Sequence, residues 1–340
     1  MQNHYLDKRS TFMEPEVTQY GGAHMVMSNV MKEVKTRYVN IDTRFARDLP
    51  QPGIPPTPVS NYTIDFPERV QKARSISVAN VELPLSFFNV SQQLGNNTFV
   101  ITTTDNVGNT TPYTFTIPDG LYGLSSANPT GQILDIILII STDISNSPIQ
   151  NDVSLNFTSS QNNFGATFIY TNTNINITDF SIQFDVDKNG VADRYNLKSK
   201  LGWMLGFRKQ RYSMADFDGS GLLNSEALID LIGPRYVYLA VDEFSNHAPQ
   251  SSFVSMLPRS ILNKNILARV SIISNQVSFI TTFMTLEIAS IPNGLLISDT
   301  REYTDDIDLQ RLNVQLVDEY GRNIDLNGLD FSFTLVVKHT

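Results

Sequence analysis

The sequence predicts an all-β protein, an antiparallel jelly-roll β-sandwich with short helices and an inserted β-rich lobe. Three observations support this fold class. Apolar and polar residues alternate with period two through most of the chain. The links between these stretches are short and rich in Pro, Gly, Asn and Asp, as turns require. Only two segments depart from the alternation.

The first 34 residues show neither strand nor helix periodicity. They contain Gly21-Gly22 and several methionines, so we interpret residues 1–34 as an N-terminal arm. A disordered tail and a segment that orders on a partner have the same sequence signature. Residues 35–340 then form the predicted jelly-roll domain.

Strands are expected wherever the alternation is sustained outside the proline-rich loop 49–58. About a dozen such segments with short links favour a sandwich over a parallel sheet. They include KTRYVNI, NYTIDFP, RSISVANVELP, PRYVYLAVDEF, KNILARVSII, QVSFITTFMTLEIA, LQRLNVQLVDEYG and LDFSFTLVVKH.

Residues 91–180 are dominated by Thr, Asn and Ser interleaved with Phe, Tyr, Ile and Val. Period-two spacing of the bulky residues persists through this range, as in NNTFVITTTDN and DVSLNFTSS. Thr and aromatic residues favour pleated surfaces, whereas Asn and Gly form turns. We therefore expect this range to form the inserted lobe, facing solvent.

Two segments predict short helices instead, residues 131–141 and 197–207. In the second, Leu197, Leu201, Met204 and Leu205 share one helical face. Its two glycines would let the helix end and turn closely against the sheet. Trp203 and Phe207 are expected to be buried, and Arg208 to be free for a carboxylate.

Composition limits the classes of function. The chain has 340 residues, no cysteine and a formal net charge of −9 from scattered residues. Disulfides and thiolate metal sites are thereby excluded, and no cationic stripe is present for nucleic acid. The amino terminus lacks the apolar run of a secretory signal, and no stretch predicts a membrane span.

Two segments resemble calcium-binding loops because acidic and amide oxygens alternate around a glycine. One offers Asp185, Asp187, Asn189 and Asp193; the other offers Asp216, Asp218 and Ser220. Asn196 stands where the first loop needs a closing acid, and in the second Glu226 falls one residue early. An Asp/Asn/Gly hairpin turn explains the same residues without a metal, and we favour it.

No sequence pattern predicts catalysis. The four histidines are scattered, and phosphate loops and nucleophile elbows are missing from the sequence. A glycosidase carboxylate pair leaves no local signature, so this alternative stays open. Asp42, Arg44, Arg47 and Asp48 are close enough to form ion pairs at a strand end or a subunit contact. We expect no enzyme, no catalytic residue and no cofactor, with calcium at the two loops as the open alternative.

Four segments resemble jelly-roll capsid proteins of nucleocytoplasmic large DNA viruses and virophages. The most diagnostic is the run Leu312-Asn-Val-Gln-Leu-Val-Asp-Glu-Tyr-Gly-Arg-Asn-Ile-Asp-Leu-Asn-Gly-Leu-Asp-Phe-Ser-Phe-Thr-Leu335. The others are YVNIDTRF at 38–45, ANVELP at 79–84 and LGWMLGFR at 201–208. The turn residues between NVQLV and LDFSFTLVV suggest that these two strands pair as neighbours.

The resemblance implies a structural protein of the virion capsid, assembled in the host cytoplasm. Within this family the chain is most similar to the vertex (penton) protein, a homopentamer that contacts the major and minor capsid proteins. A minor capsid or cement protein is the alternative in the same class. A calcium-dependent carbohydrate-binding or adhesive β-sandwich is the alternative from another class.

Overall fold

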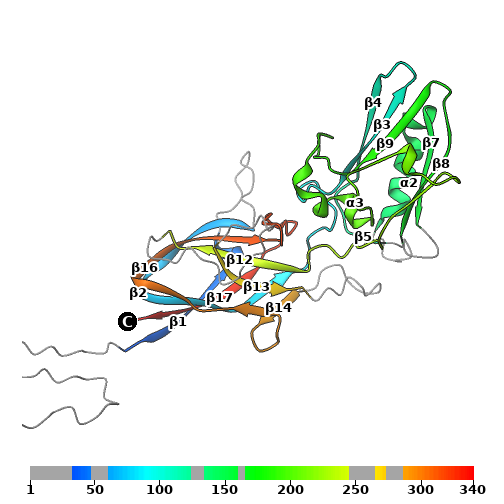
Figure 1. Cartoon of the computed structure of the whole chain (residues 1–340). Helices are drawn as coiled ribbons and strands as arrows, with labels where there is room; N and C mark the ends of the chain where they lie inside the picture. The colour runs from blue at the N-terminus through cyan, green and yellow to red at the C-terminus, as the bar shows by residue number, and fades with distance from the viewer. Residues whose placement is uncertain (1–32, 47–59, 124–133, 160–164, 245–264, 273–285) are drawn as a thin grey trace, which may run out of the picture.

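The computed structural model describes residues 33–46, 60–123, 134–159, 165–244, 265–272 and 286–340. Its strands form two lobes joined end to end (Figure 1). The predicted arm, residues 1–34, lies outside the described residues except for its last two positions. No helix among the described residues is long and apolar enough to cross a membrane.

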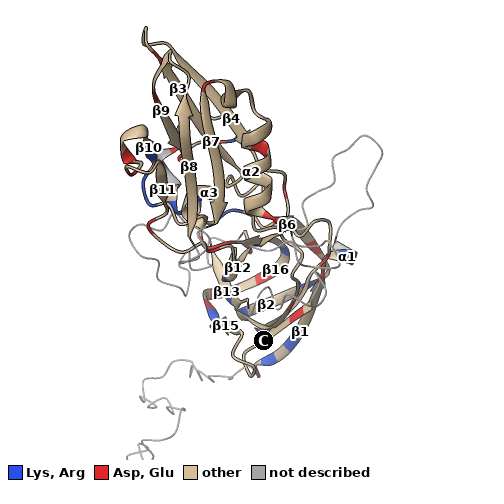
Figure 2. Cartoon of the chain, turned by 90° about the vertical axis from the view of Figure 1, so that its right-hand side faces the viewer, with Lys and Arg blue, Asp and Glu red and all other residues tan. Residues whose placement is uncertain are grey.

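The first lobe, called here the jelly-roll lobe, is one curled antiparallel sheet in the order β1-β17-β2-β16-β12-β13-β15, with β14 also paired to β2. Figure 2 views this curled sheet from another side. Its strands are β1 (Lys35–Asp42), β2 (Asn61–Pro84), β12 (Tyr236–Asp242), β13 (Ile266–Ser271), β14 (Leu286–Ser290), β15 (Leu296–Ser298), β16 (Arg301–Val317) and β17 (Ser332–His339). A four-residue helix, α1 (Thr43–Ala46), follows β1.

Two long strands, β2 and β16, make the sheet curl. Their pairing shifts register at three places between Glu302 and Arg311, and such bulges bend a sheet. The first part of β2 pairs with β16, whereas its last part pairs with β17 and β14. The curled sheet thus encloses a single hydrophobic core that takes residues from both long strands and from their neighbours. This architecture confirms the predicted all-β, jelly-roll-like sandwich.

The expected pairing of NVQLV with LDFSFTLVV is wrong. These segments lie in β16 and β17, and β2 is inserted between them. The chain does reverse tightly after Val317, where Val317 bridges Asn323, but the link then continues to β17 with Ile324, Leu326 and Phe331 buried against the core. The two segments written as NYTIDFP and RSISVANVELP belong to one strand, β2.

The second lobe, called here the insertion lobe, lies between β2 and β12. Its two antiparallel sheets have the orders β10-β9-β3-β4 and β11-β8-β7. The strands are β3 (Thr98–Asp105), β4 (Thr110–Thr116), β7 (Val153–Ser159), β8 (Ala166–Thr173), β9 (Ile177–Gln183), β10 (Arg211–Ser213) and β11 (Leu222–Asn224), with a parallel pair β5 (Tyr122–Gly123) and β6 (Leu134–Asp135).

A separate hydrophobic core fills this lobe and extends from Val90 to Leu223. Buried aromatic rings dominate it; Phe168, for example, contacts Phe157 at 4.7 Å and Phe207 at 5.6 Å between ring centroids. The core therefore continues beyond the Thr/Asn-rich range 91–180. Composition missed the remainder because the segments after residue 180 have fewer Thr and Asn residues, although they pack on the same core.

The helices differ in position from the expectation. α2 (Ile136–Asn146) begins after Asp135, whose carboxylate accepts the N–H groups of Ile137 and Leu138. It buries Ile136, Ile140 and Ile144 along one stripe and ends before Pro148. The helix predicted at 197–207 is instead a 3-10 turn, η2 (Arg194–Ser199), followed by the short α3 (Leu201–Met204). The remaining 3-10 turns are η1 (Pro148–Asn151) and η3 (Met214–Asp216).

Candidate functional site

The first predicted calcium loop is a hairpin turn. The Asp187 carboxylate accepts the backbone N–H groups of Asn189 at 2.8 Å and Val191 at 2.9 Å, which lowers the pKa of Asp187. Asp185 is buried and accepts from the side-chain amide of Gln183 at 2.8 Å. Asp193 forms an ion pair with Lys200 at 2.8 Å. The acidic side chains of this loop thus have different partners and do not converge.

The second predicted loop has the same arrangement. Asp218 accepts the backbone N–H groups of Ser220 and Leu222 at 2.8 and 2.9 Å. The ammonium group of Lys209, 2.7 Å away, holds the pKa of Asp216 below its ordinary value. The Glu226 carboxylate accepts a hydrogen bond from the Tyr212 hydroxyl at 2.7 Å, so it does not complete a coordination shell around a metal ion.

Four hairpins share one Asp-x-x-Gly-x pattern, starting at Asp105, Asp187, Asp218 and Asp318. In each, the Asp side chain accepts the N–H groups of the third and fifth residues, and glycine takes a positive φ. This is a tight β-hairpin turn reinforced by an Asp side chain. Across the described part of the chain, no three His, Cys, Asp or Glu side chains are placed to hold a metal ion.

The segment LGWMLGFR forms the base of the insertion lobe. A Cβ on Gly202 would lie 2.3 Å from the Phe184 ring, and one on Gly206 would lie 2.0 Å from the Ala227 carbonyl oxygen. The two glycines therefore permit the close packing that the sequence predicts. Phe207 is buried as expected, whereas Trp203 is only half-buried. Trp203 remains accessible because it lies in a pocket.

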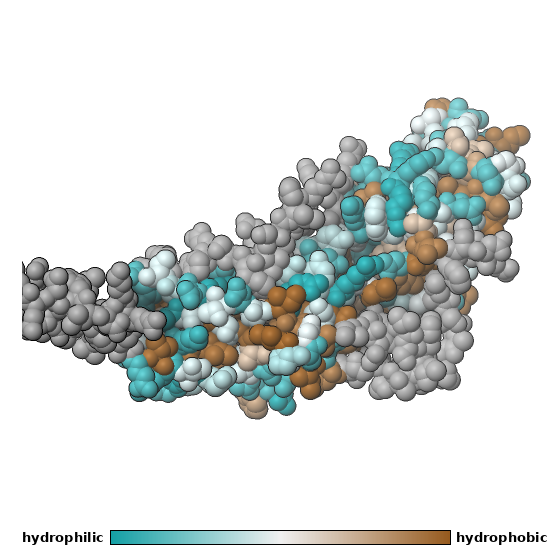
Figure 3. Space-filling view, turned by 60° about the horizontal axis from the view of Figure 1, so that its bottom comes forward, coloured by the Kyte–Doolittle hydropathy of each residue, from teal (hydrophilic) through white to brown (hydrophobic). Residues whose placement is uncertain are grey.

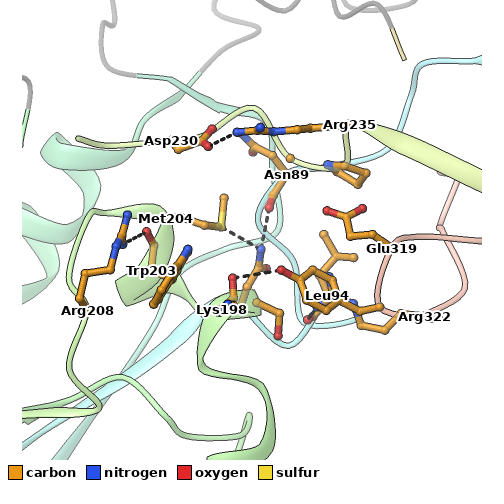
Figure 4. A pocket seen from close by; sticks show the side chains of 15 residues that line it. Asn89, Leu94, Lys198, Trp203, Met204, Arg208, Asp230, Arg235, Glu319 and Arg322 are labelled. Carbon is orange, nitrogen blue, oxygen red and sulfur yellow. Dashed lines mark hydrogen bonds and ion pairs between the residues drawn. The ribbon is translucent and has the colours of Figure 1, made fainter. Parts of the chain in front are cut away.

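This pocket, called here the junction pocket, lies where the two lobes meet and has a volume of about 220 Å³ (Figure 4). Its walls come from four segments distant in sequence, residues 89–96, 198–208, 230–235 and 319–322. The last of these belongs to the hairpin that starts at Asp318, between β16 and β17. Sequence reasoning missed the pocket because its segments are far apart along the chain.

Arginine and aromatic side chains are stacked in the junction pocket. The Arg208 guanidinium lies 4.1 Å from the centre of the Trp203 ring and donates to the Trp203 carbonyl at 2.8 Å. The Lys198 ammonium lies 5.7 Å from the same ring. The sequence predicts that Arg208 is free for a carboxylate; among the described residues its guanidinium donates to the backbone carbonyls of Trp203 and Phe207 and forms no ion pair with a carboxylate.

Hydrogen bonds through the same hairpin join the lobes. Asp318 is fully buried and binds the Arg322 guanidinium at 2.7 Å. Arg322 also donates to the Leu94 carbonyl, and the Gln93 side chain donates to the Asn323 carbonyl at 3.0 Å. The junction is therefore held by specific polar contacts as well as by the chain connections.

Three of the four family-like segments form adjacent strands. YVNIDTRF forms the end of β1 and most of α1, ANVELP ends β2, and the carboxyl-terminal run extends from the end of β16 into β17. Ile41 pairs with Phe333, which also pairs with Val81. Thr43 donates to Asp330 at 2.7 Å, which ties α1 to the start of β17. The fourth segment, LGWMLGFR, meets the carboxyl-terminal run across the junction pocket.

The charges of the first family-like segment form a local ion pair. Asp42 binds the Arg44 guanidinium at 2.6 Å, and this hydrogen bond lowers the pKa of Asp42. The Arg44 side chain is 66% exposed, so the pair lies on the surface at the end of β1. Arg47 and Asp48 lie outside the described residues.

Exposed apolar side chains lie at both edges of the half-sheet β1-β17-β2-β14. At the β1 edge, Tyr38 and Phe45 are 70% and 83% exposed. At the β14 edge, Leu286 and Ile288 are 59% and 54% exposed. Figure 3 shows hydrophobic patches among hydrophilic residues on one face of this lobe. Exposed apolar patches of this kind mark contact surfaces.

Comparisons with known proteins give little further information. No family model matches the chain, and no curated protein matches it. Among solved structures, the fold is similar to the mavirus penton protein, with 9% identity over 91% of this chain and 100% of that chain. The TM-score is 0.41. At these values the likeness carries no argument about function.

Proposed function

We propose that this chain is a structural capsid protein of a large icosahedral DNA virus and forms the pentameric capsomer at the vertices. The proposal rests on the resemblance of four segments to the jelly-roll capsid family, and one observation carries it. Segments far apart in the sequence, which resemble the family independently, form a continuous unit of β1, β17, the end of β2 and the junction pocket.

A closed ring requires a heterologous contact, in which two different faces of each subunit meet. The half-sheet supports such a contact because its two opposite edges, β1 and β14, both carry exposed apolar residues. Among the described residues, β14 pairs with β2 alone and β1 with β17 alone. Exposed edge strands offer both apolar area and unpaired backbone groups to a neighbour.

Within the virion the vertex capsomer would contact the major and minor capsid proteins. The N-terminal arm is our candidate for reaching them, since methionine side chains adapt to irregular grooves. Assembly in the host cytoplasm belongs to the same proposal.

The decisive measurement is the mass of the purified protein by light scattering at several concentrations. A pentamer, five times the 38.1 kDa of the monomer, is the expected result. Ile288→Lys should abolish the pentamer because it places a charge in the proposed apolar contact. Val107→Lys is the control, since Val107 is 80% exposed in the hairpin between β3 and β4 of the insertion lobe.

A monomer at every concentration that binds only other capsid proteins would contradict the pentameric role and favour a minor capsid or cement protein. Equal loss of the pentamer in both lysine variants would contradict the assignment of β14 to the contact.

A further inference from the structure

The junction pocket has an unusual charge for this chain. Although the net charge of the protein is −9, four basic side chains line the pocket against two acidic ones. Arg235 pairs with Asp230 at 2.7 Å, and Arg322 pairs with Asp318. Within the part of the chain that the structure describes, Lys198 and Arg208 have no ion pair with a carboxylate. Two cations therefore remain against the single acid Glu319.

Glu319 supplies a second, independent observation. One of its carboxylate oxygens, Oε2, is buried and has no hydrogen-bond partner. The side chain lies between Arg235 and Arg322 (Figure 4). A buried polar atom without a partner costs free energy, so such atoms are normally satisfied by a ligand or by a change of protonation.

Burial raises the pKa of Glu319, and the neighbouring Asp318 raises it further. Arg322 and Arg235 act in the opposite direction, and Tyr320 is the remaining titratable neighbour on the same hairpin. In its protonated form the Glu319 carboxyl is a hydrogen-bond donor. An anion in the pocket would then receive one hydrogen bond from Glu319 and face two unpaired cations.

We propose that the junction pocket binds a carboxylate, presented as an aspartate or glutamate side chain by an acidic segment of a neighbouring protein subunit. That a neighbouring subunit supplies this side chain rests on the proposed function. That the pocket binds a carboxylate does not depend on it. A volume of about 220 Å³ fits one side chain with its adjoining backbone and is smaller than the pockets that enclose whole cofactors.

A carboxylate also matches the charge better than a phosphate group. The pocket has one uncompensated positive charge when Glu319 is ionised and two when it is protonated, so a single carboxylate never brings an excess of negative charge into it. A phosphate dianion would bring such an excess whenever Glu319 is ionised. A second copy of the chain offers acidic side chains in excess, since it has 34 Asp and Glu residues against 25 Lys and Arg residues.

The test uses the full chain and a blocked tripeptide, acetyl-Asp-Glu-Asp-amide, with acetyl-Asn-Gln-Asn-amide as the uncharged control. Calorimetry should show that only the acidic peptide binds. Lys198→Gln should weaken its binding about tenfold, because it removes an exposed cation without a carboxylate partner. Lys188→Gln, an exposed lysine outside the pocket, should leave the affinity unchanged.

Protonation provides a second readout. Binding should tighten as pH falls from neutral toward the raised pKa of Glu319, within the range where the peptide carboxylates stay ionised. Glu319→Gln should bind tightly throughout this range because its amide mimics the protonated acid. Equal affinity of wild type and Lys198→Gln, equal affinity for the two peptides, tighter binding of inorganic phosphate, or an unchanged pH dependence in Glu319→Gln would each overturn the proposal.

Light scattering on the same preparations separates the two proposals. If the protein binds the peptide but never forms a pentamer, the proposed carboxylate site is supported and the vertex role is contradicted. A pentamer that does not bind the peptide would overturn the pocket and sustain the vertex role.

Discussion

The substitution Asp318→Ala tests whether the junction hairpin holds the protein together. The Asp318 carboxylate is fully buried and accepts three hydrogen bonds, from the N–H groups of Tyr320 and Arg322 at 2.9 Å and from the Arg322 guanidinium at 2.7 Å. Alanine removes all three. The arginine side chain, only 23% exposed, is then left without its carboxylate.

The expected magnitude follows from this burial. Removing one partner of a buried ion pair costs ~3–5 kcal/mol, mainly because the other charge stays buried without compensation. Partial exposure of Arg322 lets water replace some of the lost interaction, so we expect about 3 kcal/mol, near the lower limit. Urea unfolding followed by circular dichroism measures this loss in the free energy of unfolding.

A matched control exists in the chain. Asp105 accepts the two equivalent backbone N–H groups in a hairpin of the same pattern at the tip of the insertion lobe, but among the described residues it binds no arginine. Asp105→Ala should therefore destabilise much less than Asp318→Ala. Equal losses in the two variants would refute the role of burial and of Arg322, and would leave the turn geometry as the whole effect.

Three further predictions concern the lobes, the pH dependence and calcium. Phe168→Ala should cost ~3–5 kcal/mol and unfold the insertion lobe before the jelly-roll lobe, because the two cores are separate; fluorescence of the single tryptophan, Trp203, should then change at lower urea than the far-ultraviolet circular dichroism. Because burial raises the pKa of Glu319, stability should fall as pH rises above 4.5 through the raised value, and Glu319→Gln should remove this slope and be more stable at neutral pH. Millimolar calcium should give no heat in calorimetry, since Asp187 and Asp218 already accept two backbone N–H groups each; a saturable heat would contradict the hairpin interpretation.

Alternation of apolar and polar residues was sufficient to predict the fold class and the strands of six or more residues that the structure describes, whereas strands of two or three residues such as β10 and β11 are too short to show it, and most of QVSFITTFMTLEIA lies outside the described residues. The alternation indicates which face of a strand is buried, and this information is contained in the residues of that strand alone. The order of strands in a sheet depends on contacts between distant segments. The turn residues between β16 and β17 therefore could not show that β2 lies between these two strands. The bend that allows one strand, β2, to serve three partners is likewise a property of its bulges.

The candidate sites divide in the same way. Asp-x-x-Gly-x is a local pattern, and its seven occurrences in the sequence, four of which form the hairpins described above, could have indicated a turn motif instead of a metal loop. The junction pocket depends on the approach of four distant segments, of which the sequence singled out two, LGWMLGFR and residues 319–322 of the carboxyl-terminal run, but gave no sign that they meet. The Oε2 atom of Glu319 has no hydrogen-bond partner because of how distant segments pack around it, and the spacing of residues along the sequence does not reveal such packing.

The insertion lobe enters after β2 and returns at β12, and it has its own hydrophobic core. The insertion lobe is connected to the jelly-roll lobe by two chain segments and by the hairpin that starts at Asp318, so it is a replaceable module. An engineer could substitute another compact domain between residues 85 and 235 while keeping the jelly-roll sheet and its core.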